Sequence, residues 1–449
     1  MRRIKKWRAL LLSGLASLLL AGCMMTASVE DLYVLPKLPE EYQSLQAQIE
    51  AILTSGAEYA APTAGSNLQP VQLVDLNGDG EEEALAFFRI SGEEKKPLKI
   101  YIFRTAGDAY EQVAAIEGSG TTINSIRYVD MNGDGRREIL VSWRVSTEMQ
   151  ALEVYTLEDL TTAMMYAPYA RYTVADLDSD GIQELVVLRS DNTETGGSVA
   201  DYYDYDASGK NLQLWSTAKL SMTVAELQGM QTGTLQGGEP AVFVTGVEAE
   251  SRTITDILMY NQSELTNIVL NSATGVSTEI CRSLSLQPTD INGDGVTEVP
   301  APAELRSEDE ETYWKIYWKS YRADGSAEQE AITYHNLSDS WYLMIPDDWD
   351  DHFTVRQKTI SSTERATTFY SVSGRQIGDE LLTIYTLTGS NRESQAARGG
   401  RTILSRQLSG TVHAVSYTSA YEEWRYFITP EEMVERFHAI VAQWSTGEN

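Results

Sequence analysis

One nine-residue pattern recurs four times along this 449-residue chain and constrains its fold more than any other feature. The copies read DLNGDGEEE, DMNGDGRRE, DLDSDGIQE and DINGDGVTE, and they begin at Asp75, Asp130, Asp176 and Asp290. Successive starts lie 55, 46 and 114 residues apart, so the last interval is close to two of the shorter ones. A regular period of this size predicts a repeat architecture in which each motif marks the same place in one structural unit.

A degenerate fifth unit is expected inside the long interval, near residue 233. The stretch TGTLQGGEPAVFVTG places Gly233, Leu235, Gly237 and Gly238 where the acids and the glycine of the motif would fall. Its apolar run AVFV takes the place of ALAF, ILVS and LVVL in the other units. We therefore predict a unit that lost its motif side chains but kept the turn and the following strand.

Each unit contains four segments with the composition of strands. The motif lies between the first and the second, for example between VQLVD and EALAFFRI. Four short strands in each repeat are the signature of a β-propeller blade. Over roughly residues 68–330 the units resemble the FG-GAP and VCBS families of extracellular, integrin-type propeller repeats. The resemblance implies a β-propeller of about five four-stranded blades, with an open or larger array as the alternative.

The segments on either side of the repeats have their own patterns. Before them, Tyr42, Leu45, Ile49, Ile52 and Leu53 have helical spacing between Pro39 and Gly56, which predicts a short amphipathic helix. After them, alternating strand-like stretches are followed by a segment over residues 429–444. A capping box of Thr429 and Glu432 and a stripe of Val434, Phe437, Val441 and Trp444 predict a helix there.

The chain is therefore expected to be mainly β. Its divisions are a signal segment over residues 1–22, a tether with the short helix over 23–66, propeller repeats over 67–332 and a separate antiparallel α+β domain over 333–449. The last domain weakly resembles PsbP-like domains, and this resemblance implies little about its function.

The N-terminus predicts export and anchoring. A basic start, MRRIKKWR, precedes an apolar run of 14 residues that is too short to span a bilayer comfortably. The run ends in LAGC, which resembles the lipobox of bacterial lipoproteins. The resemblance implies cleavage before Cys23, diacylation of its thiol and a location on the outer face of the cell membrane. An ordinary secretory signal is the alternative. Cys281 is the only other cysteine, so no disulfide is expected within one chain.

The charge of the chain excludes some partners. Its formal net charge is −30, from 35 basic and 65 acidic residues. Such a surface repels nucleic acid phosphates, so no nucleic acid partner is expected. Metal cations and basic partners are its natural counter-ions.

The motif has the chemistry of a calcium loop, but not that of an EF-hand. An EF-hand loop ends in a bidentate glutamate at its twelfth position. The residues at that position are apolar and cannot bind a metal: Ala86, Val141, Val187 and Ala301. The flanking segments are also strand-like rather than helical. The motif instead provides side-chain oxygens at positions 1, 3, 5 and 9 and a backbone carbonyl at position 7, and a glycine at position 6 suits a sharp turn.

This pattern resembles the calcium loops of integrin-type FG-GAP blades, which implies up to four structural Ca²⁺ ions. The candidate metal-binding residues are Asp75, Asn77, Asp79, Glu81, Glu83, Asp130, Asn132, Asp134, Arg136, Glu138, Asp176, Asp178, Asp180, Ile182, Glu184, Asp290, Asn292, Asp294, Val296 and Glu298. The alternative is a hydrated Asx turn without a metal, because NGDG is also a good turn sequence.

No catalytic set stands out in the sequence, so no catalytic residue is assigned. The stretch YWKIYWKSY, residues 313–321, either buries Trp314, Ile316 and Trp318 or presents an aromatic ladder to sugars. The first hypothesis for function is a lipid-anchored envelope protein with a calcium-stabilised propeller that binds or scaffolds an extracellular glycan or protein. The alternative is an extracellular polysaccharide-degrading enzyme, a lyase or hydrolase, built on the propeller.

Overall fold

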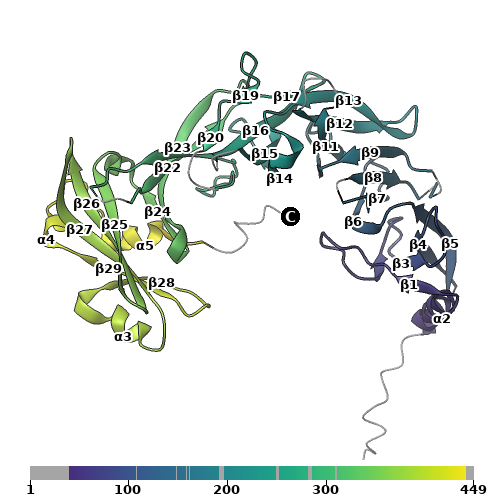
Figure 1. The fold of residues 1–449 in the computed structure, drawn as a ribbon, viewed down its shortest axis with the longest axis horizontal. Coiled ribbons are helices and arrows are strands. Elements are labelled where there is room, and N and C mark those ends of the chain that lie inside the picture. The colour runs from purple at the N-terminus through teal and green to yellow at the C-terminus, as the bar shows by residue number, and fades with distance from the viewer. Residues whose placement is uncertain are drawn as a thin grey trace, which may run out of the picture.

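Successive antiparallel sheets follow one another along the chain and lie around an open arc in the computed structural model (Figure 1). The structure describes residues 40–440, apart from residues 108, 148, 158, 161, 192–196, 249–251, 282–285 and 309–310. The expected signal segment, the tether and Cys23 lie outside the described residues, as does the side chain of Cys281. Among the described helices, none is both long and apolar enough to cross a membrane.

The first repeat forms a five-stranded sheet next to the N-terminal helix. Its elements are α2 (Glu40–Thr54), β1 (Ala57–Tyr59), β2 (Val71–Val74), β3 (Glu83–Ile90), β4 (Leu98–Ala106) and β5 (Ala109–Gly118). The sheet has the order β1-β3-β4-β5, and β2 also pairs with β3. Helix α2 packs on one face through Tyr42, Leu45, Ile49, Ile52 and Leu53, as the helical spacing predicted.

The second and third repeats are four-stranded meanders in chain order. The second consists of β6 (Thr122–Val129), β7 (Glu138–Arg144), β8 (Gln150–Tyr155) and β9 (Met165–Tyr169). The third consists of β10 (Arg171–Ala175), β11 (Glu184–Asp191), β12 (Gly197–Asp206) and β13 (Asn211–Lys219).

The interval without a motif also forms a meander. Its elements are η1 (Val224–Glu226), β14 (Leu227–Thr234), β15 (Pro240–Glu248), β16 (Arg252–Asn261) and β17 (Glu264–Asn267), followed by the short strands β18 (Leu270–Asn271), β19 (Val276–Ser277) and β20 (Ile280–Cys281). The turn between β14 and β15 is closed by the Leu235 amide, which donates to the Glu239 carbonyl at 2.8 Å. A short turn therefore replaces the motif, and the strand pair on either side of it is kept.

The last repeat continues directly into the C-terminal region. After a bridge between Thr289 and Glu298, one sheet contains β21 (Val299–Glu304), β22 (Trp314–Tyr321), β23 (Ala327–Asn336), β24 (Trp341–Ile345) and β30 (Phe437–Ala439). The boundary that the sequence suggested between residues 332 and 333 lies inside β23. The repeats and the C-terminal region thus share a continuous sheet, because β23 pairs with β22 on one side and β24 on the other.

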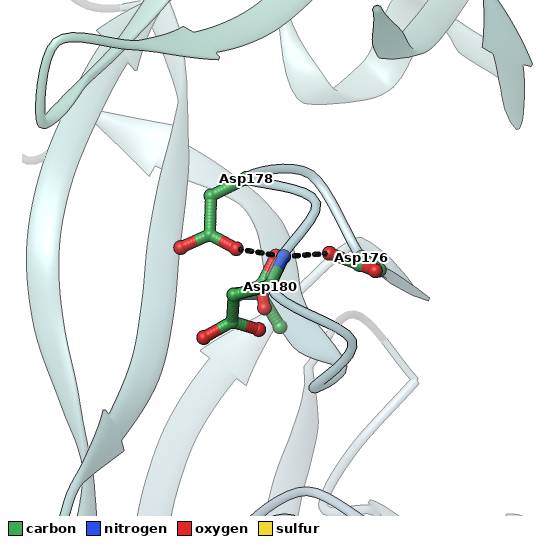
Figure 2. Close-up of side chains that lie close together, drawn as sticks. Asp176, Asp178 and Asp180 are labelled. Carbon is green, nitrogen blue, oxygen red and sulfur yellow. Dashed lines mark hydrogen bonds between the residues drawn. The ribbon is translucent and has the colours of Figure 1, made fainter.

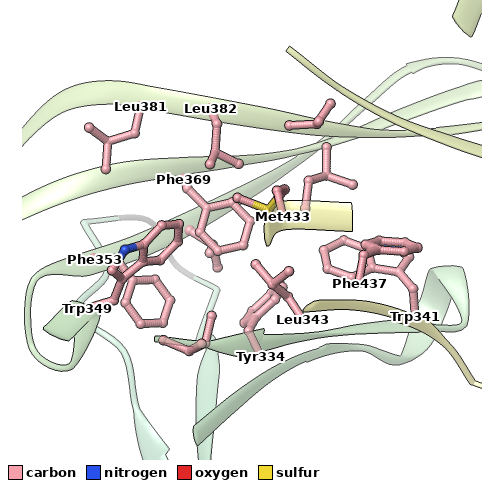
Figure 3. Packing of buried hydrophobic residues seen from close by; sticks show 14 of the residues in the cluster. Tyr334, Trp341, Leu343, Trp349, Phe353, Phe369, Leu381, Leu382, Met433 and Phe437 are labelled. Carbon is pink, nitrogen blue, oxygen red and sulfur yellow. The ribbon is translucent and has the colours of Figure 1, made fainter. Parts of the chain in front are cut away.

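A second C-terminal sheet packs against this one. Its strands, in spatial order, are β25 (Phe353–Ser361), β26 (Glu364–Ser373), β27 (Gln376–Leu387), β29 (Val412–Tyr417) and β28 (Thr402–Arg406). The remaining elements are η2 (Leu337–Asp339), η3 (Asp347–Trp349), α3 (Arg392–Ala396), η4 (Arg398–Gly400), α4 (Ser419–Glu422) and α5 (Pro430–Arg436). The shared core includes Trp341, Leu343, Trp349 and Phe369 (Figure 3).

The helix predicted over residues 429–444 is shorter than expected. Its capping box is present, and the Glu432 amide donates to the Thr429 hydroxyl at 3.2 Å. The helix ends at Arg436, however, and Phe437 enters β30 opposite Leu343. The His438 ring stacks on Tyr342, so pairing with β24 outweighs the helical pattern of the sequence. Val434 is exposed, and Val441 and Trp444 lie outside the described residues.

The repeats stack face to face through the strand that follows each motif. In β3, Leu85 and Phe87 face the second repeat, whereas Phe88 on the opposite face packs with the side chains of α2. In β7, Ile139 faces the first repeat and Leu140 faces the third. Because successive side chains of a strand point to opposite faces, one continuous apolar strand contributes to two interfaces. Helix α2 covers one end of the stack and the second C-terminal sheet covers the other.

The aromatic stretch in β22 belongs to the core rather than to an exposed ladder. Ile316 and Trp318 are fully buried, and Trp314 is half-buried. On the opposite face, Tyr313 and Tyr321 are also buried. The Trp318 indole donates to the Thr333 hydroxyl at 2.8 Å, as a buried ring nitrogen requires.

Candidate metal centre

All four motifs form loops with one backbone geometry. Each first-position aspartate accepts two or three backbone N–H groups of its own loop. Asp75, for example, accepts from Gly78 at 2.7 Å and from Gly80 at 3.0 Å. The position-6 glycines have φ between +82° and +91°, as predicted: Gly80, Gly135, Gly181 and Gly295. The position-7 amides each donate to the position-5 aspartate at 2.8 Å: Glu81, Arg136, Ile182 and Val296.

The position-9 glutamates are buried at the base of these loops. Their exposed fractions lie between 0% and 2%: Glu83, Glu138, Glu184 and Glu298. In every loop, Oε2 of this glutamate accepts the amide of the position-2 residue, at distances of 2.6 to 2.9 Å. One carboxylate oxygen therefore fixes the loop, and what the other contacts differs from loop to loop.

Loops of adjacent repeats touch one another. The Leu76 carbonyl accepts the Arg137 amide at 2.7 Å, which joins the first loop to the second. A Cβ at Gly78, where φ is +76°, would lie 3.0 Å from the Gly135 carbonyl oxygen. A Cβ at Gly133 would lie 3.1 Å from the side chain of Ile182 in the third loop. The first three motif loops therefore form a row, and a Cβ at Gly78 or Gly133 would be tight against the neighbouring loop.

The third loop has the composition of a cation site. Ligand oxygens of Asp176, Asp178, Asp180 and Glu184 lie within 4.8 Å of one another. Figure 2 shows the three aspartates around the Asp180 amide, which donates to Asp176 and Asp178 at 3.1 Å each. Such a set of oxygens is what a hard divalent cation such as Ca²⁺ prefers.

Among the described residues, no basic side chain forms an ion pair with the buried glutamate of this loop. Glu184 Oε1 is buried and has no hydrogen-bond partner within the described part of the chain. Burial, together with Asp178, Asp204 and Asp176, raises the pKa of Glu184 to about 8. Burial also raises the pKa of Asp204, and Asp178 and Asp180 raise it further. A cation among these five carboxylates would relieve both the repulsion and the unpaired oxygen.

A positive charge from β4 reaches the buried glutamate of the first loop. Glu83 Oε1 accepts the Asn77 amide at 2.9 Å and the Arg104 guanidinium Nε at 3.0 Å. Arg104 is 45% exposed and Glu83 only 2%, measured on their side chains. The guanidinium group therefore reaches the buried carboxylate from the solvent side. It provides the first loop with a positive charge next to the glutamate, and none of the described residues does so in the third loop.

In the second and fourth loops, the buried glutamate has no ion pair among the described residues, and its pKa is raised less than that of Glu184. Glu138 Oε1 accepts from the Asn132 side chain at 3.0 Å. Glu298 Oε1 is buried without a partner among the described residues, and the Asn292 side chain donates to Asp294 at 2.9 Å. Burial, and then the aspartates of each loop, raises the pKa of Glu138 and of Glu298 to about 7.

Comparisons with known proteins neither name a family nor add to this site. No family model and no curated protein matches the chain. A crystal structure of a protein from Lactobacillus plantarum is similar at 12% identity and a TM-score of 0.26, covering 72% of this chain and 86% of that one. A hypothetical protein from Leishmania major is similar at 11% identity and a TM-score of 0.21, covering 64% and 94%. An endo-1,5-alpha-L-arabinanase from Thermotoga petrophila is similar at 11% identity and a TM-score of 0.21, covering 80% and 96%. At these TM-scores the similarities carry no argument about fold or function.

Two residues that distinguish the loops were not among the predicted ligands. Ala84 pairs with Phe103 across β3 and β4, so Arg104 follows beside Glu83. Leu185 pairs with Tyr203 across β11 and β12, so Asp204 follows beside Glu184. The only signal in the sequence would have been the register of the third strand against the second, and the motif does not contain it.

Proposed function

We propose that this chain is a lipid-anchored protein of the bacterial cell envelope, in which a calcium-stabilised array of propeller-type blades serves as a binding or scaffolding module. The observation that carries the proposal is the Glu184 carboxylate, buried among three aspartates with one oxygen unpaired. The ionised form of such a group is costly in a folded protein unless a cation occupies the site.

Calcium fits this cluster better than magnesium. Ca²⁺ accepts six to eight oxygen ligands in flexible geometry, whereas Mg²⁺ requires near-ideal octahedral geometry and retains its waters. Asp176, Asp178, Asp180 and Glu184 can supply several carboxylate oxygens, and the Ile182 carbonyl is the predicted additional ligand. By the shared motif we extend the proposal to up to four loops, with the third loop as the strongest site.

An extracellular location suits weak structural calcium sites. Extracellular calcium modules bind with dissociation constants of about 10⁻⁴ to 10⁻³ M. At millimolar calcium, each occupied loop would then add on the order of 1 kcal/mol to the free energy of unfolding. The lipobox that ends at Cys23 supports anchoring at the outer face of the membrane, because two acyl chains hold a protein stably.

The binding role is preferred to the polysaccharide-degrading alternative. The motif carboxylates accept backbone amides of their own loops, as shown by Asp75 and Glu83. A glycoside hydrolase instead needs an acid and a base or nucleophile placed on either side of a substrate bond. The motif loops are built as structural elements.

Elemental analysis and calorimetry test the calcium proposal. We expect the purified protein to retain calcium and its melting temperature to fall on addition of a chelator. An unchanged melting temperature, together with no bound calcium, would mean that the loops are acidic turns that bind no metal. Separately, Cys23→Ser should release the protein from the membrane fraction or block its processing. Unaltered maturation and fractionation of this variant would refute the lipid anchor.

A further inference from the structure

A polar pocket lies between the first and second repeats, beside the first two motif loops. Val74 and Val129 directly precede the first aspartates of these loops, and Arg137 is the eighth residue of the second motif. The volume of the pocket is about 370 Å³. The lining residues come from the segment before β2, from β2, from β6 and from the second motif loop: Ser66, Asn67, Gln72, Leu73, Val74, Arg127, Tyr128, Val129 and Arg137. This volume is at the lower end of the range of small-molecule sites.

One wall of the pocket, formed by Asn67, Gln72 and Tyr128, is held in place by hydrogen bonds. The Tyr128 hydroxyl donates to Gln72 Oε1 at 2.6 Å. Gln72 Nε2 donates to the Asn67 carbonyl at 2.9 Å, and Asn67 Nδ2 donates to the Ile126 carbonyl at 3.1 Å. The Tyr128 and Asn67 bonds connect the two repeats, and Gln72 Nε2 also donates to the Gln69 carbonyl at 3.0 Å. The wall is therefore preorganised, and preorganisation lowers the cost of binding a ligand.

The guanidinium N–H groups of the two arginines of the pocket are available to a ligand. Within the described part of the chain, the side chains of Arg127 and Arg137 form no hydrogen bond and no ion pair, in contrast to Arg104, Arg189 and Arg365, which pair with carboxylates. None of the described residues that line the pocket is acidic, although the chain has 65 acidic residues and a net charge of −30. Two guanidinium groups at one pocket of so acidic a protein would be complemented by an anion, which guanidinium groups bind through charge-assisted hydrogen bonds.

We propose that this pocket binds a small carboxylate that also carries hydroxyl groups, as the acidic sugar units of a polysaccharide do. The guanidinium groups of Arg127 and Arg137 would take the carboxylate. The free oxygens of Ser66 and Asn67 would take the hydroxyl groups. The inference extends the proposed binding role by naming a ligand chemistry, and it does not require that the motif loops hold calcium.

Titration calorimetry of the protein without its signal segment, in millimolar calcium, tests the proposal with D-glucuronate, D-glucose and inorganic phosphate. Glucuronate should bind more tightly than either of the others. Arg127→Gln and Arg137→Gln should each weaken glucuronate binding by about tenfold or more, the loss expected for a charge-assisted hydrogen bond. Arg144→Gln is the matched control, because Arg144 is exposed on β7, contacts Asn124 and does not line the pocket.

Several outcomes would overturn the inference. Equal affinity for glucuronate and glucose would remove the role of the arginines, as would unchanged affinity in both pocket variants. Phosphate binding as tight as that of glucuronate would show a general oxyanion site without a place for hydroxyl groups. Calcium content, measured in the same samples, separates this test from the calcium proposal. Glucuronate binding in a protein that holds no calcium would support the pocket and refute the calcium proposal.

Discussion

The first and third motif loops have the same backbone, but they balance their charge in opposite ways. In the first, Arg104 donates to the buried Glu83 at 3.0 Å. In the third, Asp204 lies near the buried Glu184, and a fourth carboxylate, Asp178, replaces the asparagine of the first loop. The carboxylate of the first loop is neutralised by a residue of the next strand. In the third loop, the residue of the next strand adds a further negative charge. The motif therefore specifies the turn, and the neighbouring strand decides how strongly the loop needs a cation.

The largest effect is expected for Arg104→Gln in the absence of calcium. The variant leaves Glu83 buried without its cation, which costs several kcal/mol when a pair is fully buried. Because Arg104 is 45% exposed, solvent screening reduces this to about 1–2 kcal/mol. Urea unfolding in chelator measures the loss.

Arg322→Gln is the matched control, since Arg322 and Glu328 form an ion pair in which both side chains are about half exposed. Its cost should be small. If the two variants lose equal stability, Arg104 does not neutralise the first loop.

The next largest effect is expected on removal of calcium, which should destabilise the third loop more than the first. We expect residues 176–184 to lose hydrogen-exchange protection on chelation by on the order of 1 kcal/mol, by mass action at millimolar calcium. Residues 75–83 should change much less, because Arg104 remains in place. Equal loss of protection in both loops would show that the guanidinium does not substitute for the metal.

A smaller effect is expected for Asp178→Asn, which gives the third loop the asparagine of the first. The new amide can donate to Glu184 Oε1, as Asn77 and Asn132 do to their glutamates. One gained hydrogen bond and one lost repulsion should stabilise the calcium-free protein by about 0.5–1.5 kcal/mol. The same variant should bind calcium more weakly. Destabilisation in chelator would contradict this account, and Asn77→Asp is the reciprocal variant.

The calcium-free protein should also show a pH dependence. The folded-state pKa of Glu184 is raised to about 8, and those of Glu138 and Glu298 to about 7. A raised carboxyl pKa means that the folded state holds its proton longer than the unfolded chain does. The associated stability is complete below the unfolded pKa of about 4.5 and is lost as the pH rises through the folded pKa.

The melting temperature in chelator should therefore fall between pH 6.5 and pH 8.5. His335 and His413 do not interfere, because burial lowers their pKa values to about 3 and about 4 and both rings stay neutral over this range. Glu184→Gln should flatten the slope. A slope of the same size in wild type and variant would exclude Glu184 as its source.

Much of the fold could be predicted because it depends on patterns among residues that are close together in the sequence. The motif spacing located the hairpins, the alternation of apolar residues located the stacked strands, and the helical spacing from Tyr42 to Leu53 located α2. The unit without a motif was also found, because the run AVFV preserves the buried strand β15.

What could not be predicted depends on contacts between distant segments. The continuity of β23 across residues 332 and 333 depends on pairing with strands on both sides. Phe437 leaves the helical pattern because β24 offers a partner more than ninety residues earlier in the chain. Arg104 and Asp204 came next to the motif glutamates only through strand register. Local propensity is weak against such tertiary pairing.

The alternating faces of the strand after each motif bear on how such a protein can change length over evolution. A unit contacts the next through one face of this strand and the preceding unit through the other, as Ile139 and Leu140 do. A duplicated internal unit would present both faces already matched to its neighbours, and the terminal caps would need no alteration. The unit with the turn at Leu235 stacks without a motif, so a copy can lose its acidic loop and still be inherited as a spacer.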